Sequence, residues 1–196
     1  MNYDAFFSTI IASKKYDKHE EIELKLKEHC LDLKSRISSG GKGWISNKTY
    51  NTSDGQYEIY KDKEFEQLTK WIEKQIYDYC DETGIDNSNL ENSGSWFNIY
   101  YQGDYQEKHV HPNSIISAIY ILCASVESAK IYFSTPLNEM FYVKYQQQKQ
   151  QLVQQISCQS IPGTLIVFPS YLPHSVERHN STELRISLSY NYKQVL

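Results

Sequence analysis

Several features that mark other protein classes are missing from this sequence of 196 residues. None of its four cysteines forms a Cys-x-x-Cys pair, which argues against a zinc ribbon and against a disulfide framework. No apolar run reaches the length of a membrane span, and the N-terminus lacks the pattern of a secretory signal. We therefore expect a cytoplasmic protein with no membrane partner.

Positive charge is not in excess either. The formal net charge is −4 and the pI is about 5.9, so no basic field attracts phosphate backbones and nucleic acid is not expected as a partner. The length suits one well-buried core, which predicts a single domain over residues 1–196. The oligomeric state is left open, with a homodimer as one option. Tyrosine is abundant instead, and its seventeen copies are typical of strands that bury the ring and leave the hydroxyl in water.

Helical periodicity dominates the first 90 residues. Apolar residues follow a 3.6-residue period over 20–37 and, more strongly, over 65–79, and Gly84 stands where the second helix should stop. Residues 6–11 are predicted to form a short strand that pins the N-terminus. The segment 43–60 is rich in Asn, Ser, Thr and Gly around a tryptophan, and we expect it to be irregular with one short strand at most.

The period changes after residue 87, and short strands separated by turns follow to the end of the chain. They are expected at residues 96–101, 114–123, 130–134, 140–145, 152–157, 164–168 and 185–192, with the glutamine-rich stretch 146–151 as a solvated hairpin tip. The predicted fold class is α+β. Residues 95–196 should form a double-stranded β-helix, the jelly-roll architecture of cupins, with the helices of residues 1–90 packed on one sheet as a support region.

Three histidines form a candidate metal site. His109 and His111 are two residues apart, so on a strand their imidazoles point to the same face. His174 follows the apolar run 164–169 and supplies a third ligand. Three protein ligands leave coordination positions open for a substrate, as a catalytic site requires. Imidazole suits Fe, Zn, Cu, Ni and Mn alike, so the ligand type does not choose the metal.

Arg185 and Ser187 form a candidate carboxylate clamp. A turn at 178–182 is expected to fold the chain back, so that their strand becomes the antiparallel neighbour of the strand that carries His174. A guanidinium can donate two hydrogen bonds to a carboxylate, and the hydroxyl adds a third. The alternative is an ordinary ion pair between Arg185 and Glu183, which also lies two residues away.

Asn98 and Tyr100 repeat the same spacing on an earlier strand. An amide and a phenol on the inward face of a strand need polar partners, which their apolar neighbours do not offer. We interpret both as further hydrogen-bonding groups for the oxygens of a bound dicarboxylate.

Together these motifs resemble the iron(II)- and 2-oxoglutarate-dependent oxygenases, and more narrowly the small 2-oxoglutarate–iron oxygenases of bacteria and phages. The similarity lies in the segments WFNI, HVHP, SAIYIL, GTLIVFPSYLPH and RISLSYN, and more loosely in Gly43-Trp44. The resemblance implies Fe(II) held by the three histidines and 2-oxoglutarate as cosubstrate. It also implies that Arg185, Ser187, Asn98 and Tyr100 hold the distal carboxylate, with no catalytic residue beyond the metal ligands. The implied reaction is the hydroxylation of a small molecule or a peptide side chain, with release of succinate and CO2.

The sequence departs from this superfamily at one ligand. His111 stands where most members carry Asp or Glu, and a neutral ligand there should weaken Fe(II) binding. In an alternative register Asn113 takes that position. The nearest acids, Asp104 and Glu107, do not lie two residues after a histidine.

Two other functional classes stay open. The spacing Gly103-x5-His109-x-His111 also resembles a cupin motif, which would make the chain a three-histidine metalloprotein that does not use 2-oxoglutarate. A binding module that has lost its metal is the third option. The carboxylate clamp at Arg185 and Ser187 favours the oxygenase, because a three-histidine dioxygenase has no use for it.

Overall fold

The computed structural model describes residues 8–55, 57–136 and 153–195. Two long helices, α1 (His19–Arg36) and α2 (Glu66–Thr83), are accompanied by the short 3₁₀ turns η1 (Ile59–Lys61) and η2 (Lys63–Phe65). The strands are β1 (Ala12–Lys15), β2 (Tyr50–Asn51), β3 (Leu90–Tyr100), β4 (Gln106–His109), β5 (Ile116–Cys123), β6 (Ile131–Ser134), β7 (Gln155–Cys158), β8 (Thr164–Pro169), β9 (His174–Val176) and β10 (Arg185–Gln194).

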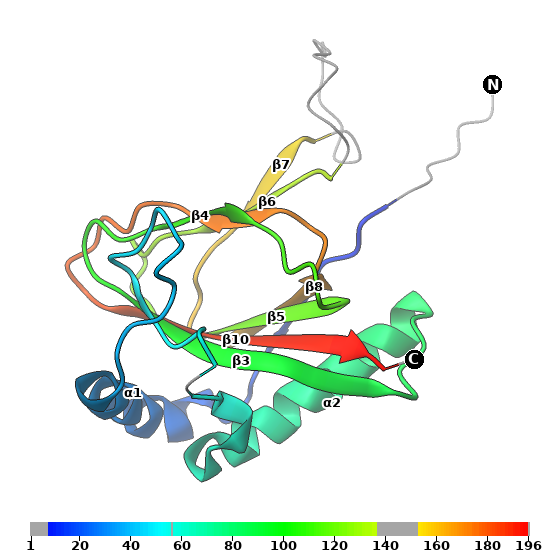
Figure 1. Cartoon of the computed structure of the whole chain (residues 1–196), viewed down its shortest axis with the longest axis horizontal. Coiled ribbons are helices and arrows are strands. Elements are labelled where there is room, and N and C mark those ends of the chain that lie inside the picture. The colour runs from blue at the N-terminus through cyan, green and yellow to red at the C-terminus, as the bar shows by residue number, and fades with distance from the viewer. Residues whose placement is uncertain (1–7, 56, 137–152, 196) are drawn as a thin grey trace.

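The strands form two facing sheets (Figure 1). A six-stranded sheet has the order β1-β8-β5-β10-β3-β2, and a four-stranded sheet has the order β4-β9-β6-β7. All pairings in the described residues are antiparallel, from β1 with β8 to β6 with β9. The predicted jelly roll with helices on one sheet is confirmed.

Strand β10 is buried on both faces, and its side chains alternate in character. Ile186, Leu188 and Tyr190 join the core shared with the helices. Arg185 and Ser187 point the opposite way, toward the four-stranded sheet, because successive side chains of a strand leave opposite faces. The alternation of side chains along β10 therefore contributes to the hydrophobic core on one face and to a polar inner surface on the other.

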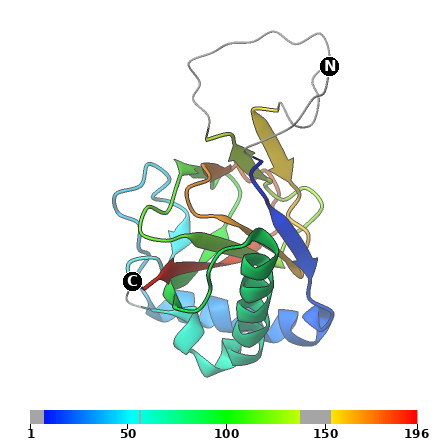
Figure 2. The same cartoon turned by 90° about the vertical axis from the view of Figure 1, so that its right-hand side faces the viewer.

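Both helices cover the outer face of the six-stranded sheet (Figure 1, Figure 2). Their buried positions recur every three to four residues, as the sequence predicts. These are Leu26, Cys30 and Leu33 of α1, and Leu68, Ile72, Ile76, Tyr79 and Cys80 of α2. Gly84 ends α2 with a φ of 73°, and its N–H donates to the carbonyl of Cys80. The predicted C-terminal stop is thus confirmed. No helix of the described residues is long and apolar enough to cross a membrane.

The N-terminal strand lies later in the sequence than predicted. Residues 8–11 are not in a strand, whereas β1 begins at Ala12 and pairs with β8. The short β2 forms within the irregular segment and pairs with β3. The first 90 residues therefore extend the sheet as well as supporting it. Residues 1–7, the strand expected at 140–145 and the glutamine-rich stretch 146–151 lie outside the described residues.

The predicted hairpin between the strands of His174 and Arg185 is wrong. Strand β9 pairs with β4 and β6, whereas β10 pairs with β3 and β5, so the two strands belong to different sheets. The connecting segment crosses from one sheet to the other. It is fixed by the buried His179, whose Nδ1 accepts the N–H of Ala129 and whose Nε2 donates to the carbonyl of Glu183. His174 and Arg185 consequently face each other across the jelly roll.

Gly163 lies in the turn before β8 and packs against His19, the first residue of α1. Its φ is +81°, and an added Cβ would lie 2.7 Å from Cγ of the buried His19. Gly163→Ala should therefore lower the free energy of unfolding by about 2 to 4 kcal/mol, which combines left-handed strain with a clash. Gly84→Ala is the matched control, since its φ is +73° but its Cβ would meet nothing within 4 Å. Urea unfolding of both variants measures the difference, and equal losses would show that the His19 contact is unimportant.

Candidate active site

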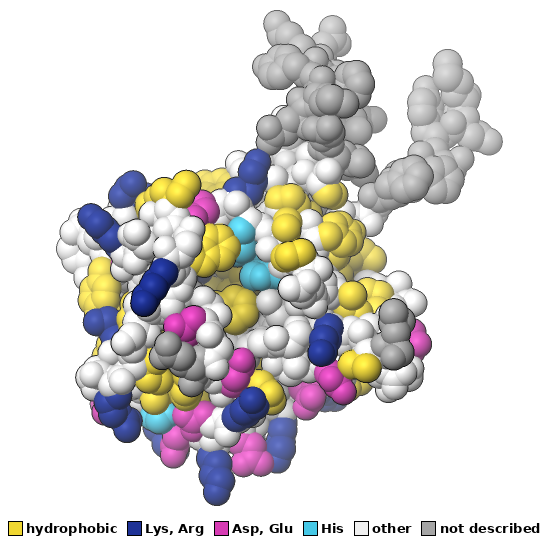
Figure 3. All heavy atoms as spheres, in the orientation of Figure 1, with side chains coloured by type: hydrophobic (Ala, Val, Ile, Leu, Met, Phe, Trp, Pro, Cys, Tyr) yellow, Lys and Arg dark blue, Asp and Glu magenta, His cyan; other side chains and the backbone are white. Residues whose placement is uncertain are grey.

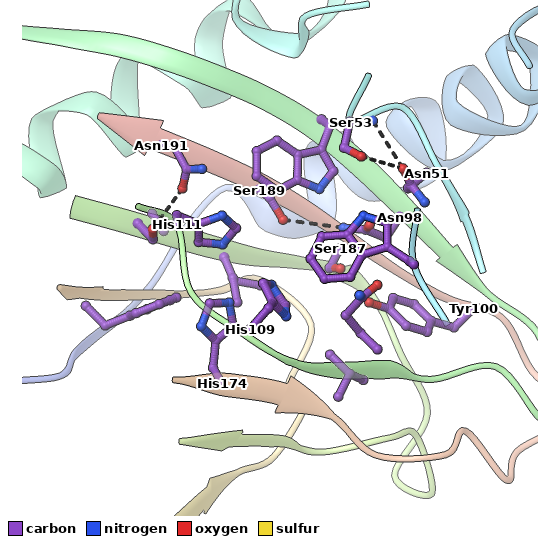
Figure 4. Close-up of a pocket in the computed structure, with 18 of the residues that line it drawn as sticks. Asn51, Ser53, Asn98, Tyr100, His109, His111, His174, Ser187, Ser189 and Asn191 are labelled. Atoms are coloured by element: carbon purple, nitrogen blue, oxygen red, sulfur yellow. Dashed lines mark hydrogen bonds between the residues drawn. The ribbon is translucent and has the colours of Figure 1, made fainter. Parts of the chain in front are cut away.

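A pocket opens between the two sheets, and its lining mixes histidine, amide, hydroxyl and aromatic side chains. On the surface it is a hollow in which histidine is visible among hydrophobic side chains (Figure 3). The six-stranded sheet supplies the polar side, and β4 and β9 supply two histidines (Figure 4). The lining residues include all seven predicted site residues: Asn98, Tyr100, His109, His111, His174, Arg185 and Ser187.

The three histidines converge. His109 and His174 are cross-strand partners in β4 and β9, which explains the 4.2 Å between their ring centroids. His111 follows β4 and is held by its backbone N–H, which donates to the carbonyl of Ser170. One nitrogen of each ring lies within 4.8 Å of those of the other two. A single ion can contact all three imidazoles at this separation.

Backbone carbonyls orient two of the rings. Nδ1 of His109 is 2.8 Å from the carbonyl oxygen of Glu107, and Nδ1 of His174 is 3.0 Å from that of Leu172. A carbonyl only accepts, so Nδ1 carries the proton in both rings. The Nε2 lone pairs then remain available to a metal, which is the usual arrangement of histidine ligands.

Burial keeps these imidazoles neutral. Desolvation lowers the pKa of all three, to about 4 for His111 and well below the ordinary value for the deeply buried His174. Mutual repulsion adds to the effect for His111 and His174, because protonation of one ring disfavours protonation of the next. Neutral rings bind a cation without first losing a proton.

No carboxylate lines the described part of the pocket. Glu107 is the nearest candidate in sequence, but its carboxylate accepts the backbone N–H groups of Ile45 and Ser46 at 2.7 and 3.0 Å. Asn113 is exposed and does not line the pocket, which speaks against the alternative ligand register. The converging set therefore consists of imidazoles alone.

Arg185 is completely buried in this pocket. Its Nε donates to Ser160 at 2.9 Å, its Nη1 donates to Ser187 at 3.3 Å, and its guanidinium lies 4.6 Å from the ring centroid of Tyr100. Its Nη2 has no hydrogen-bond partner. Glu183 is exposed, and no ion pair joins it to Arg185 in the described residues. The guanidinium is thus a buried cation for which the described residues supply no counter-anion.

The titration behaviour of this pair follows from burial. Desolvation lowers the pKa of Arg185, although the neighbouring Tyr100 opposes the shift. The same burial raises the pKa of Tyr100, which stays a neutral hydrogen-bond donor at neutral pH. A bound carboxylate would restore the stability of the charged guanidinium, so the residues fit an anionic ligand.

Several residues that line the pocket were not predicted from the sequence. Ser189 and Asn191 continue the period of two from Arg185 and Ser187 along β10, and that alternation is a signal that could have identified them. Trp96 and Val176 likewise lie two residues from Asn98 and His174 on β3 and β9. The others, Trp44, Asn51, Ser53, Gln106, Ser117, Ala118, Ile119 and Phe168, have no such spacing to a predicted site residue. Ser160, which positions Arg185, lies 25 residues away from it in sequence and also carries no signal.

Solved structures of low sequence identity share this fold. A prolyl-4-hydroxylase of Pseudomonas putida has a TM-score of 0.66 at 12% identity, covering 96% of this chain and 95% of the other. HygX of Streptomyces hygroscopicus, solved with nickel and 2-oxoglutarate bound, has a TM-score of 0.64 at 10% identity, covering 96% and 84%. The non-heme α-ketoglutarate-dependent epimerase SnoN from nogalamycin biosynthesis has a TM-score of 0.65 at 12% identity, covering 95% and 77%. None of the curated proteins matches the chain.

Fold and site define a jelly-roll protein with a metal-binding set of histidines, and the sequence places it in a family. The model of the family described as "Putative 2OG-Fe(II) oxygenase" matches residues 94–191, half of the chain. The chain belongs to this family of 2-oxoglutarate- and Fe(II)-dependent oxygenases. It is therefore an oxidoreductase whose cofactor is iron and whose cosubstrate is 2-oxoglutarate.

Proposed function

We propose that His109, His111 and His174 hold the Fe(II) ion of this oxygenase. We further propose that Arg185 and Ser187, with Tyr100 and Asn98, hold the distal carboxylate of 2-oxoglutarate. One observation carries the proposal: a buried guanidinium without a protein anion shares one pocket with three converging imidazoles. A cation site and an anion site in the same cavity suit a metal-chelating dicarboxylate.

Fe(II) and 2-oxoglutarate supply the chemistry, which is oxidation of the substrate by O2 with release of succinate and CO2. The chain's own residues bind and orient. Arg185 neutralises the distal carboxylate, and its stacking on Tyr100 fixes the plane of the guanidinium. An apolar wall beside the histidines is formed by Ile119, Phe168 and Val176. This wall keeps water away from the reacting groups.

Succinate formation tests this function directly. The purified chain with Fe(II), 2-oxoglutarate and ascorbate, which supplies the electrons that a substrate would give, should form succinate and CO2 under air even without substrate, and not under nitrogen. Quantifying succinate by mass spectrometry measures the reaction. Metal binding without any 2-oxoglutarate binding would instead support the second candidate, a three-histidine metalloprotein, which is favoured by the lack of a carboxylate among the described residues that line the pocket.

The neutral ligand set predicts a gain from His111→Asp. An anionic ligand at this position reduces the net charge of the site, so the affinity for Fe(II) should rise by about tenfold. His111→Asn is the control, because it has similar size to Asp but no charge. Competition with a chelating dye measures both affinities. If both variants lose affinity equally, the imidazole of His111 contributes more to Fe(II) binding than a negative charge at this position would.

The substrate is proposed to be a small molecule or a peptide side chain. The structural relatives include a prolyl hydroxylase and an enzyme of nogalamycin biosynthesis, so both kinds occur on this fold. We also propose that the helical region 1–90 and the jelly roll work as one domain in the cytoplasm. The four cysteines support that compartment, because all are free thiols.

A further inference from the structure

The pocket continues beyond the proposed carboxylate clamp. In the register of β3 and β10, Arg185 lies opposite Tyr100, while Ser189 lies opposite Trp96 four residues further along. Opposed residues of an antiparallel pair share a face, so both pairs line the same pocket at different depths. The tryptophan subsite is defined here as Trp44, Trp96, Ser189 and Asn191 of the pocket lining, together with Ser53 and with Asn51, which pairs with Asn98.

The tryptophan subsite carries no charged side chain. Arg185 is the only Lys, Arg, Asp or Glu that lines the described pocket, and the proposed cosubstrate occupies it. A charged ligand group in this subsite would lose its hydration without gaining a counter-charge from a side chain of the subsite. The part of a substrate that enters this subsite is therefore uncharged.

Hydrogen-bonding groups line this subsite together with two indoles. The side-chain oxygen of Asn191 accepts from Ser117, which leaves its amide nitrogen to donate, and Ser189 presents a hydroxyl (Figure 4). Trp44 lies 4.9 Å from the His109 ring and Trp96 lies 5.6 Å from the His111 ring, centroid to centroid, and both indoles are partly exposed. Apolar aromatic surface and neutral polar groups therefore meet next to the metal site.

The loop that brings Trp44 is held in place before any ligand arrives. The backbone N–H groups of Ile45 and Ser46 donate to the Glu107 carboxylate, and the Thr49 hydroxyl donates to the carbonyl of Tyr105. The carbonyl of Asn51 on the edge strand β2 accepts from Gly40. These bonds preorganise the subsite and occupy backbone groups that an extended peptide would otherwise pair with.

We propose that the tryptophan subsite binds an uncharged sugar ring of the substrate. This inference rests on the proposed function and specifies its substrate class. The C–H face of a pyranose packs against an indole, and its hydroxyls both donate to and accept from amides and serine hydroxyls. A sugar ring also needs no counter-charge, in keeping with the neutral lining.

The experiment measures binding without turnover. The full-length chain is loaded with Ni(II) and 2-oxoglutarate and titrated with the methyl glycosides of glucose, galactose and N-acetylglucosamine, and separately with glucuronate and N-acetylprolinamide. Tryptophan fluorescence reports the site, because Trp44 and Trp96 are two of only three tryptophans. Calorimetry gives the affinities for the glycosides and for 2-oxoglutarate.

At least one neutral glycoside should change the emission saturably. Trp71→Phe should keep the response, since Trp71 packs on Tyr16 and Tyr120 outside the pocket, whereas the double variant Trp44→Phe/Trp96→Phe should lose it. Trp96→Ala should weaken glycoside binding about tenfold while 2-oxoglutarate binds normally.

Two results would overturn the sugar subsite while the oxygenase function stands. In the first, no neutral glycoside changes the tryptophan fluorescence although 2-oxoglutarate binds normally. In the second, N-acetylprolinamide or glucuronate binds and the neutral glycosides do not. Loss of 2-oxoglutarate binding by the wild-type chain is a different result, because it refutes the proposed function itself.

Discussion

Arg185→Ala should raise the concentration of 2-oxoglutarate needed for half-maximal succinate formation by one to two orders of magnitude. The guanidinium is buried, its Nη2 has no partner, and no acid of the described chain pairs with it. Loss of a charge-assisted pair of hydrogen bonds corresponds to about 1.5 to 3 kcal/mol. Calorimetric titration of the metal-loaded variant with 2-oxoglutarate measures the same change without turnover.

Two further variants make the Arg185 experiment specific. Arg178→Ala removes an exposed arginine that donates to the carbonyl of Gly103, so it should leave 2-oxoglutarate binding unchanged. Arg185→Lys keeps a positive charge but loses the planar fork, and should recover part of the affinity. Metal content should be normal in all three variants. Equal affinity for 2-oxoglutarate in wild type and Arg185→Ala would remove this residue from the site.

His174→Ala should abolish metal retention. His174 is buried, and its ring centroid lies 4.2 Å from that of His109. Its Nδ1 donates a hydrogen bond to the carbonyl of Leu172. Removing one of three ligands should weaken Fe(II) binding by at least about a hundredfold, more than the loss of an outer hydrogen-bond partner costs. Equilibrium dialysis followed by elemental analysis measures the retained metal.

The controls for His174 separate ligation from folding. Ring contacts with Phe168 and Phe133 surround this histidine, so alanine also leaves a cavity. His174→Gln fills most of that space without an imidazole and should lose the metal as well. His29→Ala removes a histidine of α1 that forms a hydrogen bond with Asp62 outside the pocket, and this variant should retain the metal. Unchanged metal content in a folded His174→Ala protein contradicts the assignment.

Local patterns predicted part of the elements that carry the site: β3 and β10 overlap predicted strands, whereas β4 and β9, which carry His109 and His174, were not among the predicted strands. The 3.6-residue period located both helices, and the glycine at position 84 marked the end of the second. The two-residue spacing in β10 indicated that Arg185 and Ser187 share a face, and in the structure Nη1 of Arg185 donates a hydrogen bond to the Ser187 hydroxyl. The spacing of His109 and His111 likewise predicted two neighbouring imidazoles, although His111 lies beyond the end of β4 and is placed by its backbone bond to Ser170. Each of these inferences depends only on the geometry of one helix or one strand.

Contacts between distant segments could not be predicted in this way. The sequence suggested a hairpin between the strands of His174 and Arg185, whereas the chain crosses between sheets through the corner at His179. A turn-rich segment fits a tight hairpin and a crossing equally well, because the choice depends on which strands offer free edges. Ser160 reaches Arg185 and Trp44 reaches the pocket for the same kind of reason, because hydrogen bonds to partners far away in sequence hold Ser160 and the neighbour of Trp44, Ile45.

The sequence by itself determined both helices, most of the longer strands with their faces, and the residue types of the histidine set and the clamp. These follow from periodicity, which is encoded over a few residues. Only the tertiary structure decided that the clamp opposes the histidines across two sheets, that Glu107 holds a loop instead of serving as a ligand, and that two indoles border the pocket. Such choices depend on the packing of one sheet on the other, where the lowest free energy is a property of the whole core.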